Sequence, residues 1–552
     1  MSRATYSEDQ QLSFWGWGYA NRFPDDSARR GLARLVATLV PGGDFELAAV
    51  PTIDTIDLPA SRLSIPHSLQ SFASDSPYAR ASHTYGKAYR DLVRGLTGDF
   101  LAAPDFVAEP KNEGEIRAVL DWCAEKQVAC IPFGGGTSVV GGVEGTVGDR
   151  FAGVVSLDVR RMNRVVEVDT VSRAARIQAG ATGPAIATQL AEHGLSLRHY
   201  PQSFEFSTVG GWIATRAGGH FATLHTHIDD FVESVRMLTG AGLCESRRLP
   251  GSGAGPSPDR LVLGSEGILG VITEAWMRVH ARPRWRSSAS VAFDDFAAAV
   301  RAAREIAQSG LHPANCRVLD SREAMINQVA SGKNLLVLGF ESAHHPVSWP
   351  MTQALEIARA AGGESSEPIE SDAENAGAKS EKSARAALAQ NWRQAFIEAP
   401  YRFAALASIG VVVDTFETAC TWDRFDELHR QVIAAVRDAM KTECGGGVVT
   451  CRFTHVYPDG PAPYYTFIAP GRAAEHSGDW VKSRLAQCAS IKSAASEAVL
   501  RAGGTITHHH AVGRTHRPWY DRQRPELFAE VLRAAKKSLD PAGILNPGVL
   551  ID

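Results

Sequence analysis

The sequence of 552 residues lacks several features that would assign it to common classes of protein. It has no run of about 18 apolar residues, so no helix is expected to span a membrane. Its first ten residues are polar and contain no apolar stretch typical of a signal peptide, which favours a cytoplasmic location. Neither sign of charge dominates, since 57 basic residues stand against 61 acidic ones. This near balance indicates no nucleic-acid partner.

Cysteine pairs are also missing. The eight cysteines form no CxxC motif, and the closest ones are seven residues apart. A zinc site or a disulfide framework would need a more regular spacing. The sequence therefore predicts free thiols and no metal ligated by cysteine.

Two common nucleotide-binding loops are absent as well. No GxxxxGK[ST] occurs, and no GxGxxG opens a predicted helix after a strand. Residues 251–256 read GSGAGP, but Pro256 would interrupt a helix that began there. Neither a P-loop nor a Rossmann fold is predicted.

The length of the chain predicts more than one domain. Residues 1–100 form an irregular, helix-bearing lead-in, and 101–282 alternate strands and helices. A second pattern covers 283–500, and 501–552 close the chain. The polar stretch 363–385 is expected to be a mobile surface loop. Periodicity predicts helices at 113–126, 184–192, 296–309 and 526–539, and strands at 129–132, 153–157, 165–169, 174–179, 410–413, 447–452 and 465–468.

A glycine-rich turn follows the first of these strands, in the sequence PFGGGTS at 132–138. Three consecutive glycines allow the main chain to approach a ligand closely and to point successive N–H groups at a pyrophosphate. Thr137 and Ser138 add hydroxyl donors. A plain glycine-rich turn without a ligand is the alternative interpretation of the same residues.

Four segments together resemble one family. They are PFGGGTS at 132–138, PQSFEFSTVGGWIATR at 201–216, LGSEGILGVITE at 263–274 and DPAGILNPG at 540–548. The chain resembles the vanillyl-alcohol-oxidase flavoprotein superfamily and, within it, the alkyldihydroxyacetonephosphate synthases. The resemblance implies an α+β fold with a two-part FAD-binding domain, a cap domain for the substrate, and a C-terminal segment that returns to the FAD domain.

The resemblance also implies which residues line the flavin. They are Pro132, Phe133, Gly134, Gly135, Gly136, Thr137, Ser138, Gln202, Ser203, Ser207, Thr208, Thr215, Arg216, Ala217, Gly218, Glu266, Gly267, Ile268, Leu269, Gly270, Val271 and Ile272. From the residues alone, Ser207, Thr208 and Thr215 could equally serve turns and caps, and Arg216 could form a surface ion pair. Relatives that bind FAD covalently often use a histidine near the glycine loop. Thr137 and Ser138 stand there instead, so non-covalent FAD is expected.

Three consecutive histidines, His508, His509 and His510, follow a predicted strand segment, GGTIT. Strand alternation would place His508 and His510 on one face and His509 on the other. Imidazoles suit proton transfer near neutral pH. A metal site is the alternative, although no acidic or cysteine partner stands out in the sequence. The resemblance implies that the triple histidine takes part in catalysis by removing a proton from the substrate.

Three further positions follow from the resemblance. Tyr464 matches an essential tyrosine, and Arg317 matches an arginine needed for activity. From the residues alone, Tyr464 could be a core aromatic and Arg317 part of a salt bridge. At the family's substrate-binding arginine this chain has Phe403, with Arg402 one place earlier. Arg402 would reach the substrate only if the local backbone adjusted, because one residue turns a helix by about 100°.

The resemblance implies an exchange of the acyl group of acyl-dihydroxyacetone phosphate for a fatty alcohol, through an adduct at flavin N5, in ether lipid synthesis. An FAD-dependent oxidase or dehydrogenase acting on an alcohol or a 2-hydroxy acid is the alternative, favoured by Phe403. A third interpretation is a flavin-binding protein with a regulatory role. Lipid substrates imply peripheral membrane contact, although no amphipathic anchor is evident, and the family suggests a homodimer.

Overall fold

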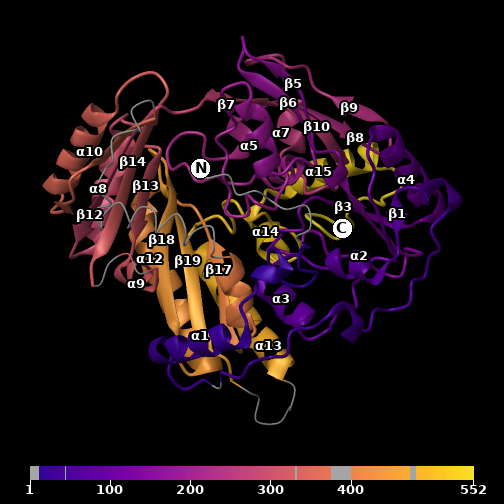
Figure 1. Ribbon diagram of the computed structural model, residues 1–552, viewed down its shortest axis with the longest axis horizontal. Helices are drawn as coiled ribbons and strands as arrows, with labels where there is room; N and C mark the ends of the chain where they lie inside the picture. The colour runs from indigo at the N-terminus through magenta and orange to yellow at the C-terminus, as the bar shows by residue number, and fades with distance from the viewer. Residues whose placement is uncertain (1–10, 44, 328, 330–331, 374–399, 473–479) are drawn as a thin grey trace.

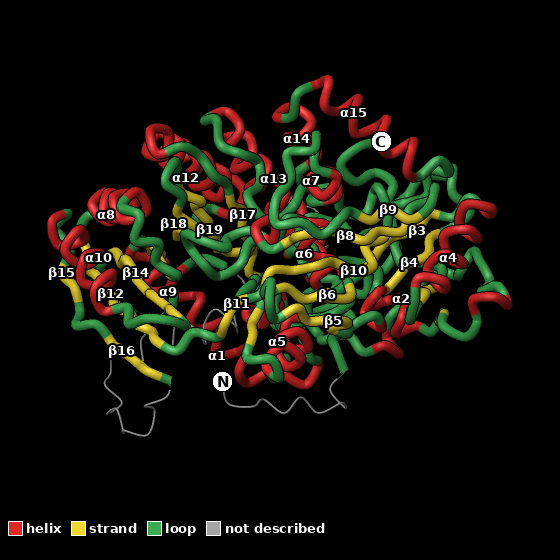
Figure 2. Tube along the Cα trace, turned by 90° about the horizontal axis from the view of Figure 1, so that it is seen from above, coloured by secondary structure: helices red, strands yellow, loops and turns green. Residues whose placement is uncertain are grey.

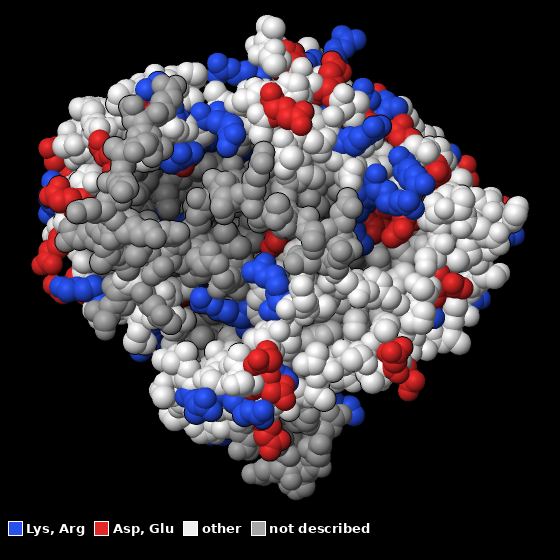
Figure 3. All heavy atoms as spheres, viewed as in Figure 1, with Lys and Arg blue, Asp and Glu red and all other residues white. Residues whose placement is uncertain are grey.

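The computed structural model describes residues 11–373, 400–472 and 480–552, except 44, 328, 330 and 331. The first ten residues, on which the prediction about a signal peptide rests, lie outside this range. So do residues 374–385 of the predicted surface loop. No helix among the described residues is long and apolar enough to cross a membrane. On the face shown in Figure 3, acidic and basic side chains are interspersed.

The first part of the chain contains two sheets, on the side of the molecule coloured indigo to magenta in Figure 1. One sheet has the strand order β1 (Ala73–Ser74), β2 (Phe106–Ala108), β4 (Val154–Asp158) and β3 (Ala129–Phe133). The other is antiparallel, in the order β5 (Val165–Asp169), β6 (Ala174–Gln178), β10 (Val271–Arg278), β8 (Val232–Leu238) and β9 (Leu243–Glu245). β7 (Leu195–Ser196) pairs with β11 (His280–Ala281).

The helices in this part of the chain are α1 (Asp26–Leu39), α2 (Pro77–Ser82), α3 (Tyr89–Leu96), α4 (Glu113–Lys126), α5 (Gly183–Ala191), α6 (Val209–Thr215) and α7 (Pro258–Val262). Of these, α1 and α3 pack with the core of the second part of the chain. Helix α4 shows why its sequence is helical. The side chain of Asn112 accepts a hydrogen bond from the backbone N–H of Glu115 at 3.0 Å, which caps its first turn. Its buried residues Ile116, Val119, Leu120 and Cys123 repeat at helical spacing. The predicted helix at 113–126 is confirmed.

The second part is one eight-stranded antiparallel sheet with helices packed against it (Figures 1 and 2). The strands run in the order β15 (Glu364–Ser365), β12 (Trp285–Phe293), β14 (Asn334–Ser342), β13 (Asn315–Leu319), β18 (Val448–Val456), β19 (Pro461–Pro470) and β17 (Val411–Glu417), and β16 (Ile369–Asp372) pairs with β12. The helices are α8 (Phe296–Gln308), α9 (Ser321–Ile326), α10 (Ser348–Ala360), α12 (Trp422–Cys444) and α13 (Trp480–Arg501).

Alternation along these strands separates a packed face from a face that bears chemistry. Tyr465 and Phe467 of β19 are buried in the core together with the apolar residues of α12. Each fully buried side chain of this size contributes about 1.5–3 kcal/mol. The register then places Tyr464 opposite Glu417 of β17 on one side and Arg452 of β18 on the other. These three polar side chains are therefore neighbours across three adjacent strands.

The C-terminal segment returns to the first part, as the resemblance implied. It contains α14 (Arg517–Gln523) and α15 (Glu526–Leu539), shown in yellow in Figure 1 among the indigo and magenta elements. The backbone N–H of Cys130 in β3 donates to the carbonyl oxygen of Ile544, and the N–H of Asn546 donates to the carbonyl oxygen of Cys130, both at 2.9 Å. The side chain of Asn546 reaches the carbonyl oxygens of Gly142 and Glu266 at 3.0 and 2.7 Å. The last residues thus fasten the glycine loop to the segment around Glu266.

Two predictions about local structure are wrong. The stretch from 363 carries β15 and β16, both paired with β12, so its described residues are not simply a loop. Residues 508–510 form bends and not a strand. Their backbone N–H groups all point at one carboxylate, that of Glu417, and Ala511 adopts a left-handed conformation at φ 72°. Neither feature is compatible with a strand ladder.

Candidate active site

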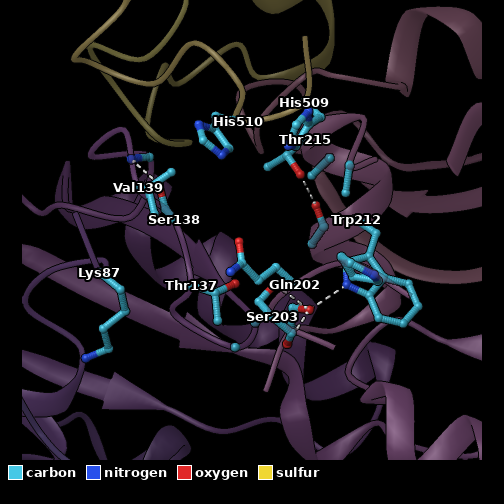
Figure 4. Close-up of a pocket in the computed structure, with 18 of the residues that line it drawn as sticks. Lys87, Thr137, Ser138, Val139, Gln202, Ser203, Trp212, Thr215, His509 and His510 are labelled. Atoms are coloured by element: carbon cyan, nitrogen blue, oxygen red, sulfur yellow. Dashed lines mark hydrogen bonds between the residues drawn. The ribbon is translucent and has the colours of Figure 1, made fainter. Parts of the chain in front are cut away.

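One large cavity lies where the two parts of the fold meet. Its walls come from the glycine loop, residues 201–219, residues 266–272, the polar face of the eight-stranded sheet, and the C-terminal histidines. Figure 4 shows His509 and His510 on one side and Thr137, Gln202 and Ser203 on the opposite side, with open space between them. Segments far apart in sequence therefore converge on one site.

The glycine loop begins where β3 ends. A Cβ on Gly134 would lie 2.4 Å from Oγ1 of Thr208, and a Cβ on Gly135 would lie 2.1 Å from the carbonyl oxygen of Phe206. A larger residue at Gly135 would require the backbone to move, and one at Gly134 would displace the side chain of Thr208. Gly136, at φ 64°, also needs the conformational freedom of glycine.

Part of the glycine loop has backbone N–H groups that are not hydrogen-bonded within the described part of the protein. Among the described residues, no protein acceptor is hydrogen-bonded to the N–H groups of 135–138. Because unpaired backbone donors beside a cavity are costly unless a ligand or water satisfies them, these groups indicate an anion or dinucleotide site.

The second segment is held by its own hydrogen bonds. Ser203 Oγ donates to Ser207 Oγ at 3.0 Å, and Nε1 of Trp212 donates to the same oxygen at 2.7 Å. Thr208 caps α6 by accepting from the N–H of Gly211 at 3.3 Å. These hydroxyls therefore serve local structure while they line the cavity.

Glu266 joins the third segment to the C-terminal loop. Its carboxyl group accepts the N–H groups of Val512 and Gly513 at 2.9 and 2.8 Å. Burial raises its pKa to about 7, although the two N–H donors oppose this shift. Glu266 thus holds the loop that carries the histidines close to the glycine loop.

Most of the predicted cofactor residues line the cavity. They are Pro132, Phe133, Gly134, Gly135, Gly136, Thr137, Ser138, Gln202, Ser203, Ser207, Thr208, Thr215, Ala217, Gly218, Glu266, Gly267, Gly270, Val271 and Ile272. The other three do not. Ile268 and Leu269 are buried in the apolar core. Arg216 turns outward to Asp229, with 2.8 Å between Nη2 and Oδ2.

Of the residues predicted to act in catalysis or substrate binding, some line the cavity and others do not. Tyr464, His509, His510 and Arg317 line the cavity, whereas His508 and Arg402 do not. His508 lies behind His509, with their Nδ1 atoms 3.0 Å apart. The predicted alternation is therefore wrong, because the bend turns two successive histidines toward the cavity. Arg402 is exposed to solvent, and Phe403 faces the cavity in its place.

Glu417 organises the triple histidine. Its carboxylate accepts the N–H groups of His508, His509 and His510 at 2.6, 3.1 and 2.9 Å, and the hydroxyl of Thr507 at 2.6 Å. The carboxylate also lies 3.6 Å from Nδ1 of His509 and 3.8 Å from Nδ1 of His510. Despite burial, these histidines hold the pKa of Glu417 well below its usual range.

The imidazoles themselves are neutral near pH 7. Burial is the largest cause, and it lowers the pKa of His509 to about 3 and that of His510 to about 4, although Glu417 acts in the opposite direction. A neutral imidazole can accept a proton, so His509 and His510 are candidate bases.

Tyr464 lies beside these histidines. Its hydroxyl donates to Oγ1 of Thr415 at 2.9 Å, and its ring stacks on that of His509 with centroids 6.0 Å apart. The guanidinium carbon of Arg452 lies over the ring of Tyr464, 4.1 Å from its centroid, and the same guanidinium is ion-paired with Glu323 at 2.6 Å. Burial raises the pKa of Tyr464, so the phenol stays protonated and can donate.

Arg317 supplies positive charge from β13. Its side chain is 1% exposed, and Nη2 donates to Nδ1 of His220 at 3.0 Å and to the carbonyl oxygen of the same residue at 3.2 Å. Burial lowers its pKa to about 9, which still leaves a cation at neutral pH. A guanidinium here can bind a phosphate or carboxylate group.

Three histidines are close enough together to bind a metal ion, since ring nitrogens of His455, His508 and His509 lie within 4.8 Å of one another. The nitrogens of His455, however, contact Oγ1 of Thr454 at 3.1 Å and the carbonyl oxygen of Gly219 at 2.9 Å. A hydrogen-bonded cluster accounts for this arrangement without a metal ligand from His455.

Sequence reasoning missed several residues of the site. Glu417 lies beyond the end of the strand predicted at 410–413, and its role depends on a segment about ninety residues later. Lys87 and Trp17 reach the cavity from the lead-in, which the sequence assigned no role in the site. Arg452 could have been found, because alternation from Tyr464 and its strand partner places it on the same face.

Comparisons with known proteins agree with this arrangement. Residues 104–246 match the model of the FAD binding domain, and 282–550 match that of the FAD linked oxidases, C-terminal domain. The chain is 30% identical to an alkyldihydroxyacetonephosphate synthase of Dictyostelium discoideum, covering 98% of this chain and 94% of the relative. It is also 30% identical to that of Trypanosoma brucei brucei, over 86% of this chain and 77% of the relative.

Solved structures give the same picture. A structure of alkyldihydroxyacetonephosphate synthase superimposes with a TM-score of 0.77 at 26% identity, covering 97% of this chain and 99% of the other. A p-cresol methylhydroxylase with bound substrate superimposes with a TM-score of 0.63 at 14% identity, over 88% and 94% of the two chains. The second likeness concerns the fold, which is α+β of the vanillyl-alcohol-oxidase type.

Proposed function

The chain belongs to the alkyldihydroxyacetonephosphate synthase family, and we propose that it exchanges the acyl group of acyl-dihydroxyacetone phosphate for a fatty alcohol, in ether lipid synthesis. One observation carries this proposal. Tyr464, His509, His510 and Arg317 line the same cavity as the glycine loop. The groups for proton transfer and for an anionic substrate are therefore next to the cofactor cradle.

The residues present fit FAD. The unpaired N–H groups of 135–138 suit its pyrophosphate, and the hydroxyls of Thr137 and Ser138 offer further donors. When bound, FAD supplies an isoalloxazine ring that can act as electrophile and nucleophile toward the reacting carbon without net oxidation. We propose that FAD is bound non-covalently, because Thr137 and Ser138 stand where the resemblance would place a histidine that attaches FAD covalently. Acid precipitation of the protein should then release all of the flavin into the supernatant.

The protein's own groups handle the proton. A fatty alcohol must lose the proton of its hydroxyl group as its oxygen replaces the departing carboxylate. His509, neutral and facing the cavity, accepts it, and Glu417 stabilises the imidazolium that results. The phenol of Tyr464, which donates to Oγ1 of Thr415 in this structure, turns its hydrogen to an oxygen of the substrate when the substrate binds. His510 is a second base at the same wall.

Two arginines are candidates for binding the substrate's phosphate. Arg317 and Arg452 both line the cavity, while Arg402 is exposed. Arg317 is the stronger candidate, because it lines the cavity at the position where the resemblance implies an arginine needed for activity. The wall at Phe403 offers only apolar contact.

The same Phe403 favours a second candidate, an FAD-dependent oxidoreductase for an alcohol or 2-hydroxy acid without a phosphate. The chain is 25% identical to glycolate oxidase subunit GlcD of Bacillus subtilis, over 82% of this chain. His509 would then accept a proton from the substrate hydroxyl. Lasting reduction of the flavin by substrate would distinguish this reaction from the exchange.

The deciding experiment uses the purified, flavin-loaded protein without oxygen. Acyl-dihydroxyacetone phosphate is mixed with an isotopically labelled fatty alcohol while the flavin absorbance is followed. The exchange predicts labelled ether product and released fatty acid in equal amounts, with no lasting bleaching. Bleaching by a simple alcohol or hydroxy acid, with no ether product, would overturn the synthase proposal in favour of the oxidoreductase.

The same proposal extends to the setting of the enzyme. It is a cytoplasmic homodimer that contacts membranes at their surface, where its lipid substrates lie. Analytical ultracentrifugation should give a species of twice the mass of the chain. Cell fractionation and flotation with lipid vesicles should show a protein that salt or dilution removes from the lipid. A monomer, or a protein never recovered with lipid, contradicts the corresponding statement.

A further inference from the structure

Three imidazoles form a continuous chain that leads away from the cavity. Nδ1 of His509 lies 3.0 Å from Nδ1 of His508, and Nε2 of His508 lies 3.0 Å from Nε2 of His227. His227 is half-buried and contributes from the loop after α6, far in sequence from the other two. Each contact is short enough for a hydrogen bond between one protonated and one bare nitrogen.

The outer end of the chain fixes its direction. Nδ1 of His227 lies 3.1 Å from the backbone carbonyl oxygen of Arg216. A carbonyl oxygen can only accept, so Nδ1 of His227 carries the proton. In a neutral imidazole the other nitrogen is then bare, and Nε2 of His227 accepts from His508.

The same reasoning applies to His508 and His509, which are closer to the cavity. His508 donates from Nε2, so its Nδ1 is bare and accepts from His509. His509 in turn holds its proton on Nδ1, which leaves its Nε2 bare. Since Nδ1 faces His508, Nε2 is the ring nitrogen available to the cavity.

A second anchor gives the same direction. The hydroxyl of Tyr457 lies 2.8 Å from Nε2 of His508 and donates to Oγ1 of Thr226 at 3.2 Å. Because its proton is used toward Thr226, the hydroxyl accepts from His508. The N–H of His508 is therefore shared between two acceptors, as in other three-centre hydrogen bonds.

Charge around the chain is consistent with neutral rings. Burial, the largest cause, lowers the pKa of His227 and holds that of His508 well below its usual range. Asp229 and Asp230 oppose the shift of His227, and the Arg216 guanidinium adds to it. The neighbouring His455, whose pKa is also well below its usual range, adds no positive charge. The Glu417 carboxylate, near Nδ1 of His509, favours a proton on that nitrogen.

We propose that His508 is a positioning residue which, held by His227 and Tyr457, keeps His509 in the tautomer whose bare Nε2 faces the cavity. The role given to His509 rests on the proposed function, whereas the tautomer does not. This series of hydrogen-bonded imidazoles explains why His508, which is outside the cavity, accompanies His509 and His510, which line it. The hydrogen bonds also give a role to His227, which is outside the cavity and whose Nδ1 contacts the carbonyl oxygen of Arg216. Through His508, it helps to set the tautomer of His509.

The test removes the anchors singly and together. The variants are His227→Leu, Tyr457→Phe and the double variant, with His227→Gln as a conservative replacement whose amide oxygen can still accept from His508. His225→Asn is the matched control, because its ring packs on Phe231 and His280 outside the chain, and asparagine tolerates its left-handed backbone. Flavin content and thermal unfolding show which variants fold.

The first measurement is 15N NMR of protein labelled at histidine, with the His509 signals assigned by their loss in His509→Gln. Wild type, His227→Gln and His225→Asn should show the proton on Nδ1 of His509. The double variant should show a mixture or the proton on Nε2. A proton on Nε2 in the wild type, or an unchanged tautomer in the double variant, would overturn the proposal even if no ether product is ever formed.

The second measurement separates kcat from KM in the exchange reaction. The double variant should lose about tenfold or more in kcat, less than the 10²–10⁴ expected for loss of a base. KM for the alcohol should stay within about twofold, and His227→Gln should recover most of the rate. An equal loss in His227→Gln and His227→Leu would mean that the side chain only fills space, and it would overturn the positioning role.

Discussion

Glu417 acts on the backbone and on the ring of His509 at once. One carboxylate oxygen accepts the N–H of His509 at 3.1 Å, and the other lies 3.6 Å from its Nδ1. The same side chain therefore fixes the bend that turns His509 toward the cavity and supplies a negative charge beside the ring. Removing the charge should affect both shape and chemistry.

Glu417→Gln tests this double role. An amide keeps one acceptor but places an N–H₂ group against backbone donors, and it no longer stabilises an imidazolium. A hydrogen bond to a charged group is worth about 1.5–3 kcal/mol, so turnover should fall tenfold or more. The free energy of unfolding, measured with urea, should fall by a similar amount. Glu427→Gln, at an exposed carboxylate of α12, is the control and should change neither quantity. Equal effects of the two substitutions would exclude a special role for Glu417.

Tyr464 and Tyr465 provide a matched pair on one strand. Tyr464 faces the cavity, whereas the hydroxyl of Tyr465 lies 3.2 Å from Nδ1 of His429 on the packed face. Tyr464→Phe should lower kcat by about 10²-fold or more, in the range for loss of a proton donor, with full flavin content. Tyr465→Phe should leave kcat within about twofold and mainly lower the melting temperature, because it removes a buried hydrogen bond. If kcat stays normal in Tyr464→Phe, the phenol does not act in the reaction.

Local sequence signals predicted part of this molecule well. The helices at 113–126 and 526–539 have the predicted bounds, because apolar periodicity marks both and Asn112 caps the first. The glycine loop is predicted from another local signal, three consecutive glycines after a strand. The triple histidine was placed on a strand because GGTIT before it has strand character. The actual bend depends on Glu417, whose contact with His509 spans 92 positions in the sequence. Such a tertiary contact leaves no local pattern.

The resemblance had a comparable limit. It identified Tyr464, His509 and Arg317, which line the cavity, because motifs keep their places along a chain. It could not show that Ile268 and Leu269 point into the core, since both lie inside a motif whose other members line the cavity. Nor could it assign Lys87, which lies outside the four segments that carry the resemblance.

Buried neutral histidines should make the fold sensitive to acid. Burial lowers the pKa of His516 to about 4 from 6.5, and this residue does not line the cavity. Below pH 6.5, His516 is protonated in the unfolded chain, whereas in the native state it becomes protonated only near pH 4. The free energy of unfolding therefore falls as the pH decreases from 6.5 to 4. Each such histidine contributes up to about 1.4 kcal/mol per pH unit.

His516→Gln should therefore flatten this dependence. Urea unfolding at pH 7, 6 and 5 should give a slope smaller than that of the wild type by up to about 1.4 kcal/mol per pH unit. His67→Gln, at an exposed position, should keep the wild-type slope. Identical slopes for all three proteins would show that His516 titrates alike in the folded and unfolded chains.

The cradle of the cofactor can be tested at Gly135. A methyl group there would meet the carbonyl oxygen of Phe206 at 2.1 Å, a contact that only a backbone shift can relieve. Gly135→Ala should separate the glycine loop from the segment 203–208 and lower the flavin content of the purified protein several-fold. Gly148→Ala, where a Cβ meets nothing within 4 Å, should retain full flavin absorbance. Normal flavin content in Gly135→Ala would mean that these two segments need not be in contact to hold FAD.

Phe403 gives the sharpest test of the substrate. The cavity wall at this position is apolar, and the neighbouring Arg402 is exposed. If acyl-dihydroxyacetone phosphate is the substrate, Phe403→Arg places a cation where the related synthases are expected to bind phosphate. A charged hydrogen bond worth about 1.5–3 kcal/mol should lower KM for this substrate by tenfold or more and leave KM for the fatty alcohol unchanged. Arg402→Ala, which alters only the surface, should leave both KM values as they are. A rise in KM for the alcohol, with no change for the phosphate substrate, would show instead that Phe403 contacts the alkyl chain.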